Sequence, residues 1–507
     1  MKYLLGIDLG TSGTKTVLFD EFGKALSSST VEYPMYQPQN GYAEQDPNDW
    51  WNATCQTSSF VIKDAGINPA DIAGIGISGQ MHGLVMLDEN GKVLRNSIIW
   101  CDGRTETQCD EITKTIGKER LIELTANPAL TGFTLGKILW VRDNEPEIYA
   151  KCKHILLPKD YVRYCLTGEF ATEVSDASGM NLLDIKTRDW CDEIIEKLNL
   201  DKSMFAKVYE SVDVTGYVTD EASSKTGLAK GTIVVGGAGD NAAAAVGMGV
   251  VKSGRAFTTI GTSGVIFAHT DKPNVDPQGR VHTFCAAVPN AYTAMSCTLS
   301  AGLSLKWFRD NFCQSEIETA NGMGVDPYYL MDKQAEKIEI GADKLIFLPY
   351  LMGERSPLLD SKARGAFIGL SSIHNKYHML RAVLEGVMYS QKTCLEVLKE
   401  MDVLPKEMLA CGGGGTSPLW RQMMADIFEC PVNTVSNKEG PALGVALLAS
   451  VGAGIYKTIE EACDKAITYR NPQESISENS EKYNKVYEIF KNLYPNLKDS
   501  YSQLNAL

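Results

Sequence analysis

The sequence contains one glycine-bounded segment twice, and this repetition decides how the chain divides. Residues 3–19 read YLLGIDLGTSGTKTVLF, and residues 256–269 read AFTTIGTSGVIFAH. In each copy the letters GTSG lie between two runs of apolar and β-branched residues, a pattern typical of a β-hairpin with a glycine-flanked tip. The copies stand half a chain length apart in 507 residues. The sequence therefore predicts two halves built on one plan, residues 1–250 and residues 251–507.

The two hairpin tips have the chemistry of an anion site. Glycine allows left-handed backbone and close approach, which leaves successive N–H groups available to a phosphate. The tips also carry the hydroxyls and backbone of Thr11, Ser12, Gly261 and Thr262. A single GTSG is more often an ordinary tight turn. A matching pair favours a site that holds a polyphosphate from both sides.

Composition excludes several classes of protein. The chain has 49 Lys and Arg against 63 Asp and Glu, a net charge of −14, and no basic cluster, which argues against a nucleic-acid partner. Its 13 cysteines stand singly, without a C-x-x-C pair, as expected in a reducing compartment. The apolar start is too short for a signal peptide, and no run reaches the ~20 residues of a membrane helix. We expect a cytoplasmic protein with no membrane partner.

Strand and helix patterns alternate along the chain, which indicates an α/β fold with mixed sheets. The expected strands cover residues 72–77, 85–87, 233–235, 345–348 and 406–410, and the expected helices cover residues 48–65, 135–144, 378–401, 418–429 and 442–451. Residues 74–79, GIGISG, match the dinucleotide fingerprint, but they lie inside a strand that leads to another strand. A nicotinamide site is disfavoured. The sequence also lacks a P-loop, so any ATP must bind in another way.

Two aspartates are candidates for catalysis. Asp8 ends the first strand beside the first tip, where a carboxylate next to phosphates is tolerable if Mg²⁺ lies between them. Asp240 follows a strand and a glycine turn and precedes four alanines. It fits an N-cap, and it also fits a general base for phosphoryl transfer, because small neighbours leave room for a substrate hydroxyl. The two interpretations are compatible.

Polar loops between apolar strands resemble the lining of a polyol pocket. Gln80, Met81 and His82 offer hydrogen-bonding groups beside an adaptable thioether, and Asp102 lies in a second such loop. Residues 411–417, CGGGGTS, follow a strand and open a helix, where a nucleotide can lie against bare backbone. Each motif alone is more often structural than functional.

Longer spaced patterns resemble the FGGY family of carbohydrate kinases. Residues 6–12, GIDLGTS, are similar to the family's first phosphate motif. Residues 132–144 resemble its N-terminal signature, and residues 365–370 with residues 378–385 resemble its C-terminal one. The resemblance extends from Gly6 to about Ala453, nearly the whole chain.

The resemblance implies a fold, a reaction and a set of site residues. It implies two duplicated ribonuclease H-like domains, as in actin, Hsp70 and hexokinase, with ATP and a sugar bound in the cleft between them. Asp240 matches the family's catalytic base, Asp8 its Mg²⁺-associated carboxylate and Asn241 a sugar contact. Thr262, Gly414 and Gly415 match its nucleotide contacts, although Gly415-Thr416 departs from the usual alanine and polar residue. The halves are then a sugar-binding N-terminal domain and a nucleotide-binding C-terminal domain.

The sugar is the least determined part of this prediction. Met81-His82 is typical of family members that convert D-xylulose to D-xylulose 5-phosphate, whereas glycerol kinases carry Arg-Glu there. The alternatives are a kinase of the same fold for ribulose, gluconate or glycerol, and an ATPase switch similar to actin or Hsp70. The sequence leaves the oligomeric state open, a homodimer included.

Overall fold

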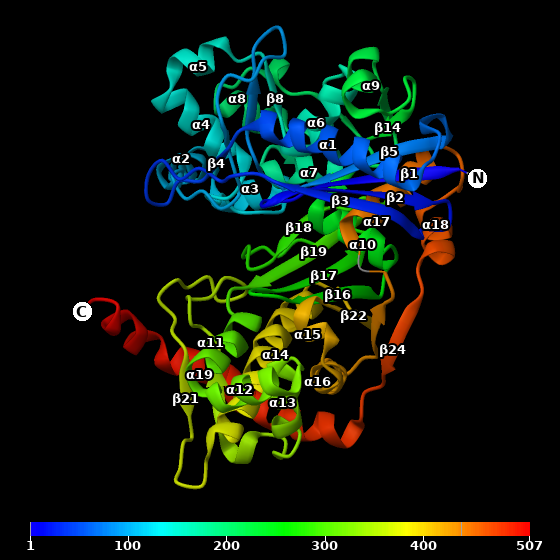
Figure 1. The fold of residues 1–507 in the computed structure, drawn as a ribbon. Helices are drawn as coiled ribbons and strands as arrows, with labels where there is room; N and C mark the ends of the chain where they lie inside the picture. The colour runs from blue at the N-terminus through cyan, green and yellow to red at the C-terminus, as the bar shows by residue number, and fades with distance from the viewer. Residues whose placement is uncertain (1, 438) are drawn as a thin grey trace.

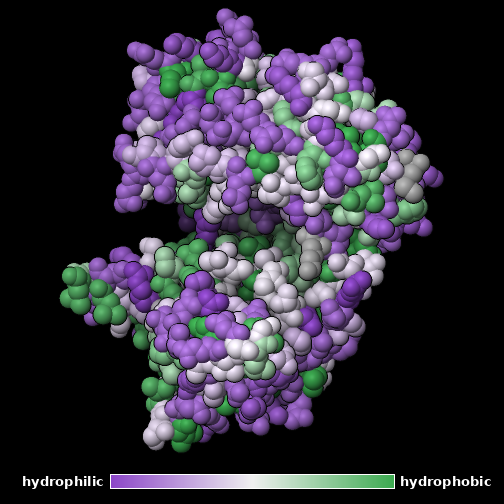
Figure 2. Space-filling view, in the orientation of Figure 1, coloured by the Kyte–Doolittle hydropathy of each residue, from purple (hydrophilic) through white to green (hydrophobic). Residues whose placement is uncertain are grey.

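The chain forms two lobes on either side of a deep groove. The computed structural model describes residues 2–437 and 439–507. Figure 1 shows the first half of the chain in the upper lobe and most of the second half in the lower lobe. In the space-filling view of Figure 2 the lobes are joined on one side, and the groove between them is open on the other. No helix of the described ranges is long and apolar enough to cross a membrane.

The upper lobe is built on a mixed sheet that begins with the first GTSG hairpin. β1 (Tyr3–Leu9) pairs antiparallel with β2 (Gly13–Asp20) and parallel with β5 (Ile72–Gly79). The strand order β3-β2-β1-β5-β14-β13 adds β3 (Ala25–Glu32), β14 (Ile233–Val235) and β13 (Val214–Tyr217). Because β1 and β5 lie in the middle of the sheet, nearly all of their side chains are buried, which explains their continuous apolar runs.

The lower lobe repeats this order. The second hairpin consists of β16 (Arg255–Ile260) and β17 (Gly264–Thr270). The order β19-β17-β16-β22-β23-β24 adds β19 (Tyr292–Thr298), β22 (Glu407–Cys411), β23 (Val432–Val435) and β24 (Tyr469–Gln473), with β18 (His282–Cys285) at the far edge. In both sheets the hairpin's first strand pairs in parallel with the strand that follows the long helix. The predicted duplication is confirmed.

The helices predicted from periodicity are present, with ends that differ by one or two residues. They are α1 (Pro47–Ala65), α4 (Thr134–Asn144), α14 (Lys376–Glu400), α16 (Pro418–Phe428) and α17 (Gly440–Gly452). Other elements of the upper lobe include α2 (Glu106–Ile116), α3 (Lys118–Thr125), α6 (Pro158–Thr167), β9 (Ala171–Glu173), α7 (Val174–Ala177), β15 (Ala238–Gly239) and α10 (Asp240–Met248). Those of the lower lobe include α11 (Gly302–Phe312), α12 (Gln314–Met323), α13 (Pro327–Ala335), α15 (Gly412–Thr416) and α19 (Ser477–Leu504).

Helix α17 joins the two halves although it belongs to the second half of the sequence. It packs on β1, on β5 and along α10 (Figure 1). Its residues Ala442 to Ser450 are all buried, in an apolar core that also contains Ala243 and Val246 of α10. The helices α10 and α17 follow equivalent strands of the two sheets, so the lobes meet through corresponding elements.

Glycines make this contact close enough for backbones to touch. A Cβ on Gly6 of β1 or Gly76 of β5 would overlap with a carbonyl oxygen of α17. A Cβ on Gly444 would overlap with the carbonyl oxygen of Ala243, and one on Gly247 with that of Gly440. The small residues of α10 and α17 are therefore required by the interface between the helices.

A glycine-to-alanine exchange tests this contact. We expect Gly444→Ala to lower the free energy of unfolding by about 1–3 kcal/mol, because the methyl group overpacks the contact between α10 and α17. Alanine's intrinsic helix preference, about 1 kcal/mol over glycine, acts in the opposite direction. The matched control is Gly322→Ala in α12, where a Cβ meets nothing within 4 Å. Urea unfolding of both variants measures the difference, and equal stability would contradict the packing argument.

Candidate active site

Two carboxylates that lie far apart in sequence meet at one edge of the upper sheet. Asp8 pairs with Ser78 of β5 from one side, and Ala238 of β15 pairs with the same Ser78 from the other side. Asp240 follows β15 directly. Strand β5 therefore brings the ends of β1 and β15, and both aspartates, to the same end of the sheet.

Asp240 is the first residue of α10, and its N-cap is Gly239. The N-cap interpretation of Asp240 is therefore wrong by one position: the glycine turn extends into the cap, and the aspartate lies inside the first helical turn. Its Oδ1 accepts hydrogen bonds from the backbone N of Asn241 at 2.7 Å and from Asn241 Nδ2 at 3.0 Å. The half-buried carboxylate offers its second oxygen for another partner.

The electrostatics of the site favour a proton on Asp240 until nearly neutral pH. Burial and the neighbouring Asp8 raise the pKa of the Asp240 carboxyl to about 7, and the hydrogen bonds from Asn241 offset part of that rise. Burial also raises the pKa of Asp8, against the opposing effects of Ser78 and Lys15. A carboxyl that titrates near the working pH is suited to general-base catalysis.

The same pair is suited to a divalent cation held jointly with phosphates. Mg²⁺ is usually bound by one or two carboxylates, water and substrate phosphates. The described residues contain no group of three or more His, Cys, Asp or Glu that would form an all-protein metal site. Asp8, half-buried near Asp240 and raised in pKa, has the chemistry of a residue that a cation would stabilise. Lys15 lies opposite Asp8 on β2 and forms an ion pair with Glu439. Sequence reasoning missed this lysine.

Met81 and His82 lie beside the segment that leads into Asp240. Met81 is in contact distance of Gly239 on one side and Gly179 on the other, since a Cβ on either glycine would come within 3.1 Å of its side chain. His82 has a left-handed backbone, with φ 70°. Its carbonyl oxygen accepts hydrogen bonds from Lys137 Nζ at 2.8 Å and from Thr134 Oγ1 at 3.1 Å. These contacts hold the Gln80–His82 loop.

The protonation of His82 follows from its contacts. Its Nδ1 lies 2.8 Å from the carbonyl oxygen of Gly179, which can only accept, so Nδ1 carries the proton. Burial and Lys137 lower the pKa of His82 to about 3, which leaves the ring neutral at physiological pH. Its Nε2 is therefore a hydrogen-bond acceptor, suited to a substrate hydroxyl.

Gln80, the residue before Met81, is connected through Gln45 to the first hairpin tip. Its Nε2 donates to Gln45 Oε1 at 2.7 Å, and Gln45 Nε2 donates to the carbonyl oxygen of Thr11 at 2.7 Å. The Oε1 atom of Gln80 is buried without a hydrogen-bond partner in the described chain, so it remains available as an acceptor. Thr11 Oγ1 accepts from Trp100 Nε1 at 2.9 Å, and Ser12 is exposed at the tip. Gln45 carries no sequence motif that would have singled it out.

The other two predicted sugar contacts, Asp102 and Asn241, differ in their burial and in how many protein hydrogen bonds they already accept. Asp102 is buried, and both of its oxygens accept hydrogen bonds: Oδ2 from Arg104 Nη2 at 2.7 Å and from the backbone N of Ala43 at 2.6 Å, and Oδ1 from the backbone N and Nε of Arg104, each at 2.9 Å. Its role as a sugar contact remains a prediction, and its visible partners are structural. Asn241, next to Asp240, is half-buried at the site.

A cavity of about 470 Å³ lies beside the second hairpin tip in the lower lobe. Gly261, Thr262 and Gly414 line it, together with Gly413, Leu303, Tyr328 and Tyr329. Gly415 lies behind this wall, where a Cβ would come within 2.9 Å of the backbone of Ala410. The two tyrosines of α13 come from a segment without a recognisable motif. Apolar walls and a glycine-lined edge suit the ring and phosphates of a nucleotide.

A duplicated two-lobed fold with a carboxyl whose pKa is raised to about 7 and a nucleotide-sized cavity beside a glycine-flanked hairpin tip suits an enzyme that transfers a phosphoryl group. The chain belongs to the FGGY family of carbohydrate kinases: residues 3–247 match the family's N-terminal domain and residues 256–453 match its C-terminal domain.

Relatives cover the whole chain. It is 39% identical over 506 residues to the xylulose kinase of Bacillus subtilis, covering 100% of this chain and 99% of the relative. It is 34% identical to the gluconokinase of the same organism, covering 99% and 97%. The structure of ligand-bound xylulose kinase from Lactobacillus acidophilus matches with a TM-score of 0.91 at 28% identity, covering 99% of this chain and 100% of that one.

The raised pKa of Asp240 predicts that replacing this carboxyl with an uncharged amide increases the free energy of unfolding, and that the increase depends on pH. Because the native pKa of about 7 lies above the ordinary value near 4, the native state holds the extra proton between those values, and stability falls as pH rises through that window. We expect Asp240→Asn to raise the free energy of unfolding by about 1–3 kcal/mol at pH 8 and by almost nothing at pH 4. Denaturant unfolding at both pH values measures this, with the exposed Asp220→Asn as control; a pH-independent gain would contradict the assignment.

Proposed function

We propose that the chain phosphorylates D-xylulose to D-xylulose 5-phosphate with ATP. The observation that carries this proposal is the half-buried Asp240 carboxyl, whose pKa burial and Asp8 raise to about 7, close to His82 and to Met81, which contacts Gly239. Asp240 accepts the proton of the sugar's terminal hydroxyl as that oxygen attacks the γ-phosphate in line. This choice of sugar is supported by xylulose kinases that match the chain over nearly its full length.

The neighbouring groups orient the sugar. Neutral His82 Nε2 and the free Oε1 of Gln80 accept hydrogen bonds from sugar hydroxyls, and Met81 packs against the carbon chain. Asn241 keeps one oxygen of Asp240 occupied, so that the second oxygen meets the reacting hydroxyl. An uncharged polyol fits this set of neutral acceptors better than a wholly apolar or a multiply charged ligand does.

ATP and Mg²⁺ complete the site. We assign the nucleotide to the 470 Å³ cavity, with its phosphates near the backbone N–H groups of the two tips, Gly10–Gly13 and Gly261–Gly264. Asp8 is the residue that would hold Mg²⁺, which supplies charge neutralisation on the transferring group. We place the reaction in the cytoplasm, a reducing compartment, because all 13 cysteines are free thiols.

A sugar panel tests the function directly. With ATP present, ADP release should depend on the sugar, and kcat/KM should be highest for D-xylulose among D-xylulose, ribulose, gluconate and glycerol. A preference for gluconate would contradict this choice of sugar and favour the gluconokinase activity for which one of its relatives is named. ATP hydrolysis at a rate indifferent to every sugar would contradict the kinase and favour a nucleotide switch.

Asp240→Asn tests the base. We expect kcat to fall about 10²–10⁴-fold, because a positioned base is removed, while ATP binding measured by calorimetry stays within twofold. Asp220→Asn, an exposed aspartate at the start of α9 (Asp220–Thr226), is the control and should retain full activity. Retention of more than about a tenth of the activity by Asp240→Asn would remove Asp240 from the role of base.

Asp8→Asn tests the metal assignment. We expect the Mg²⁺ concentration for half-maximal rate to rise at least about tenfold, since one carboxylate ligand is lost. The same variant should move the acidic limb of kcat/KM to lower pH, because the charge of Asp8 helps to raise the pKa of Asp240. An unchanged metal titration would make Asp8 a structural residue.

A further inference from the structure

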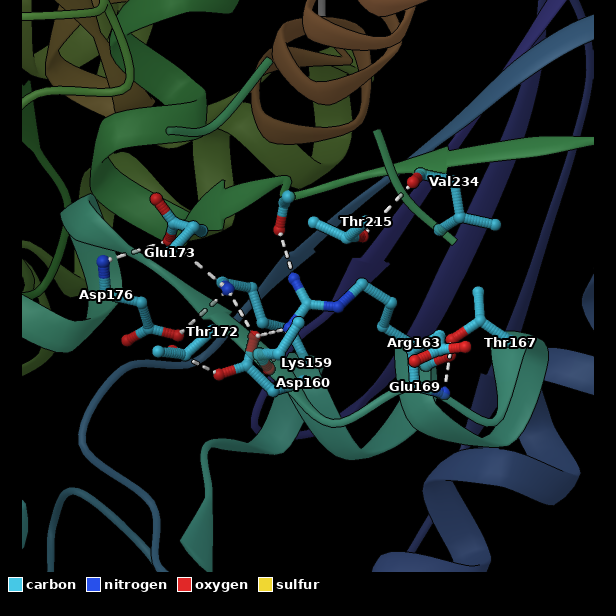
Figure 3. A network of polar contacts seen from close by, with 12 residues as sticks. Lys159, Asp160, Arg163, Thr167, Glu169, Thr172, Glu173, Asp176, Thr215 and Val234 are labelled. Atoms are coloured by element: carbon cyan, nitrogen blue, oxygen red, sulfur yellow. Dashed lines mark hydrogen bonds and ion pairs between the residues drawn. The ribbon is translucent and has the colours of Figure 1, made fainter. Parts of the chain in front are cut away.

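A cluster of charged side chains is buried next to the turn Gly236–Gly239, which immediately precedes Asp240. The charge cluster consists of Lys159, Asp160, Arg163, Glu173 and Asp176, and each side chain is at most 1% exposed. Its members come from α6, β9 and α7, and Figure 3 shows them pointing toward one another. Burying ions is costly unless they are paired and hydrogen-bonded, and a pair of apolar residues would often be as stable. Stability alone is therefore a weak reason for this cluster.

The side chains of the cluster are closely paired. Lys159 Nζ lies 2.7 Å from Asp160 Oδ1 and 3.2 Å from Glu173 Oε1, and Arg163 Nη2 lies 2.9 Å from Asp160 Oδ1 (Figure 3). Asp176 has no hydrogen-bond partner on either oxygen in the described chain. Burial raises its pKa well above the usual range, in spite of Lys159. Two cationic side chains thus face three carboxyl groups, and Lys159 Nζ also lies 3.8 Å from Asp176 Oδ2.

Three hydrogen bonds lead from the cluster and its supports to the turn that carries the base. Arg163 Nη1 donates to the carbonyl oxygen of Gly236 at 2.9 Å. Ser175 Oγ, which itself donates to Glu173 Oε1 at 2.9 Å, accepts from the backbone N of Gly239 at 3.2 Å. The carbonyl oxygen of Ser211, whose Oγ donates to Glu173 Oε2 at 2.8 Å, accepts from Gly237 N at 3.0 Å.

The turn needs this support because of its composition. Residues 236–239 read GGAG, and Gly237 has φ 75°. Glycine-rich backbone is conformationally free unless its polar groups are held. Asp240 follows the turn immediately, so any freedom there moves the base. A displacement of about 1 Å in a reacting group can cost about 10²-fold in rate.

We propose that the charge cluster is a positioning device for the catalytic base. It acts through Ser175 and Arg163, which clamp the Gly236–Gly239 turn at its two ends. Its members do not touch the substrate; Ser175 and Arg163 are positioning residues. The inference rests on the proposed function, because it takes Asp240 as the base of a sugar kinase.

The decisive variant is Ser175→Ala, which removes one buried hydroxyl and leaves all five charges in place. We expect kcat for the sugar to fall about 10–100-fold, with KM for ATP within twofold of wild type. The matched control is Thr215→Val. Thr215 Oγ1 of β13 donates to the carbonyl oxygen of Val234 at 3.1 Å; this bond is also buried and near the turn (Figure 3), but it ends on β14, the strand before the turn. The control should keep kcat within threefold.

A double-mutant cycle separates positioning from general damage. If Ser175 acts through Asp240, Ser175→Ala in an Asp240→Asn background should cost less than threefold, because the base is already absent. A further loss of tenfold or more would show an independent structural effect and overturn the proposal. Equal kcat losses for Ser175→Ala and Thr215→Val would also overturn it.

Hydrogen exchange provides a readout that does not depend on any sugar. In Ser175→Ala the backbone amides of residues 236–241 should exchange at least tenfold faster than in wild type, while the later turns of α10 stay protected. If wild type phosphorylates no sugar, the proposed function fails, and this measurement still decides whether the cluster holds the turn. Unchanged exchange at residues 236–241 would overturn the inference.

Discussion

The site depends on the close contact between α10, α17 and the upper sheet. Gly6 and Gly76 allow α17 to lie directly on β1 and β5, and Gly444 allows α10 to lie directly on α17. Strand β1 carries Asp8, and α10 begins with Asp240, so the same contact positions both carboxylates. Because interiors are packed as densely as organic crystals, a single added methyl group at this contact displaces a backbone. The contact also joins the lobes, which couples their relative position to the base.

The charges around the site are unevenly distributed, with few cationic side chains near the reacting groups. The chain has a net charge of −14, and ATP and a sugar phosphate are anions as well. Near the reacting groups, Asp8 raises the pKa of Asp240, and His82 stays neutral. Behind the turn, the cations of the charge cluster are paired with its own carboxyl groups. Formal positive charge close to the base is thus scarce, and backbone N–H groups, Lys15 and a divalent cation are left to compensate the phosphates.

Motifs and periodicity predicted the two-domain α/β fold and the two aspartates, since both hairpins and Asp8 lie in short local sequence patterns. They misplaced the helix cap by one residue, because an aspartate after a glycine turn fits both Ncap and N1 by sequence alone. They did not find Gln45, Ser175 or Gly179, which form hydrogen bonds to segments far away in the chain. Nothing in the neighbouring residues of these three indicates such partners.

The sequence by itself determined the duplication, the hairpin tips, the α/β class and the candidate carboxylates, because each of these is written in contiguous residues with a period or a spacing. Only the tertiary structure decided that Asp8 and Asp240 meet through Ser78, that burial and Asp8 raise the pKa of Asp240, and that a buried charge cluster donates a hydrogen bond to the turn before Asp240. Burial, pKa and hydrogen bonding depend on which distant segments surround a group. That environment exists only when the chain has folded.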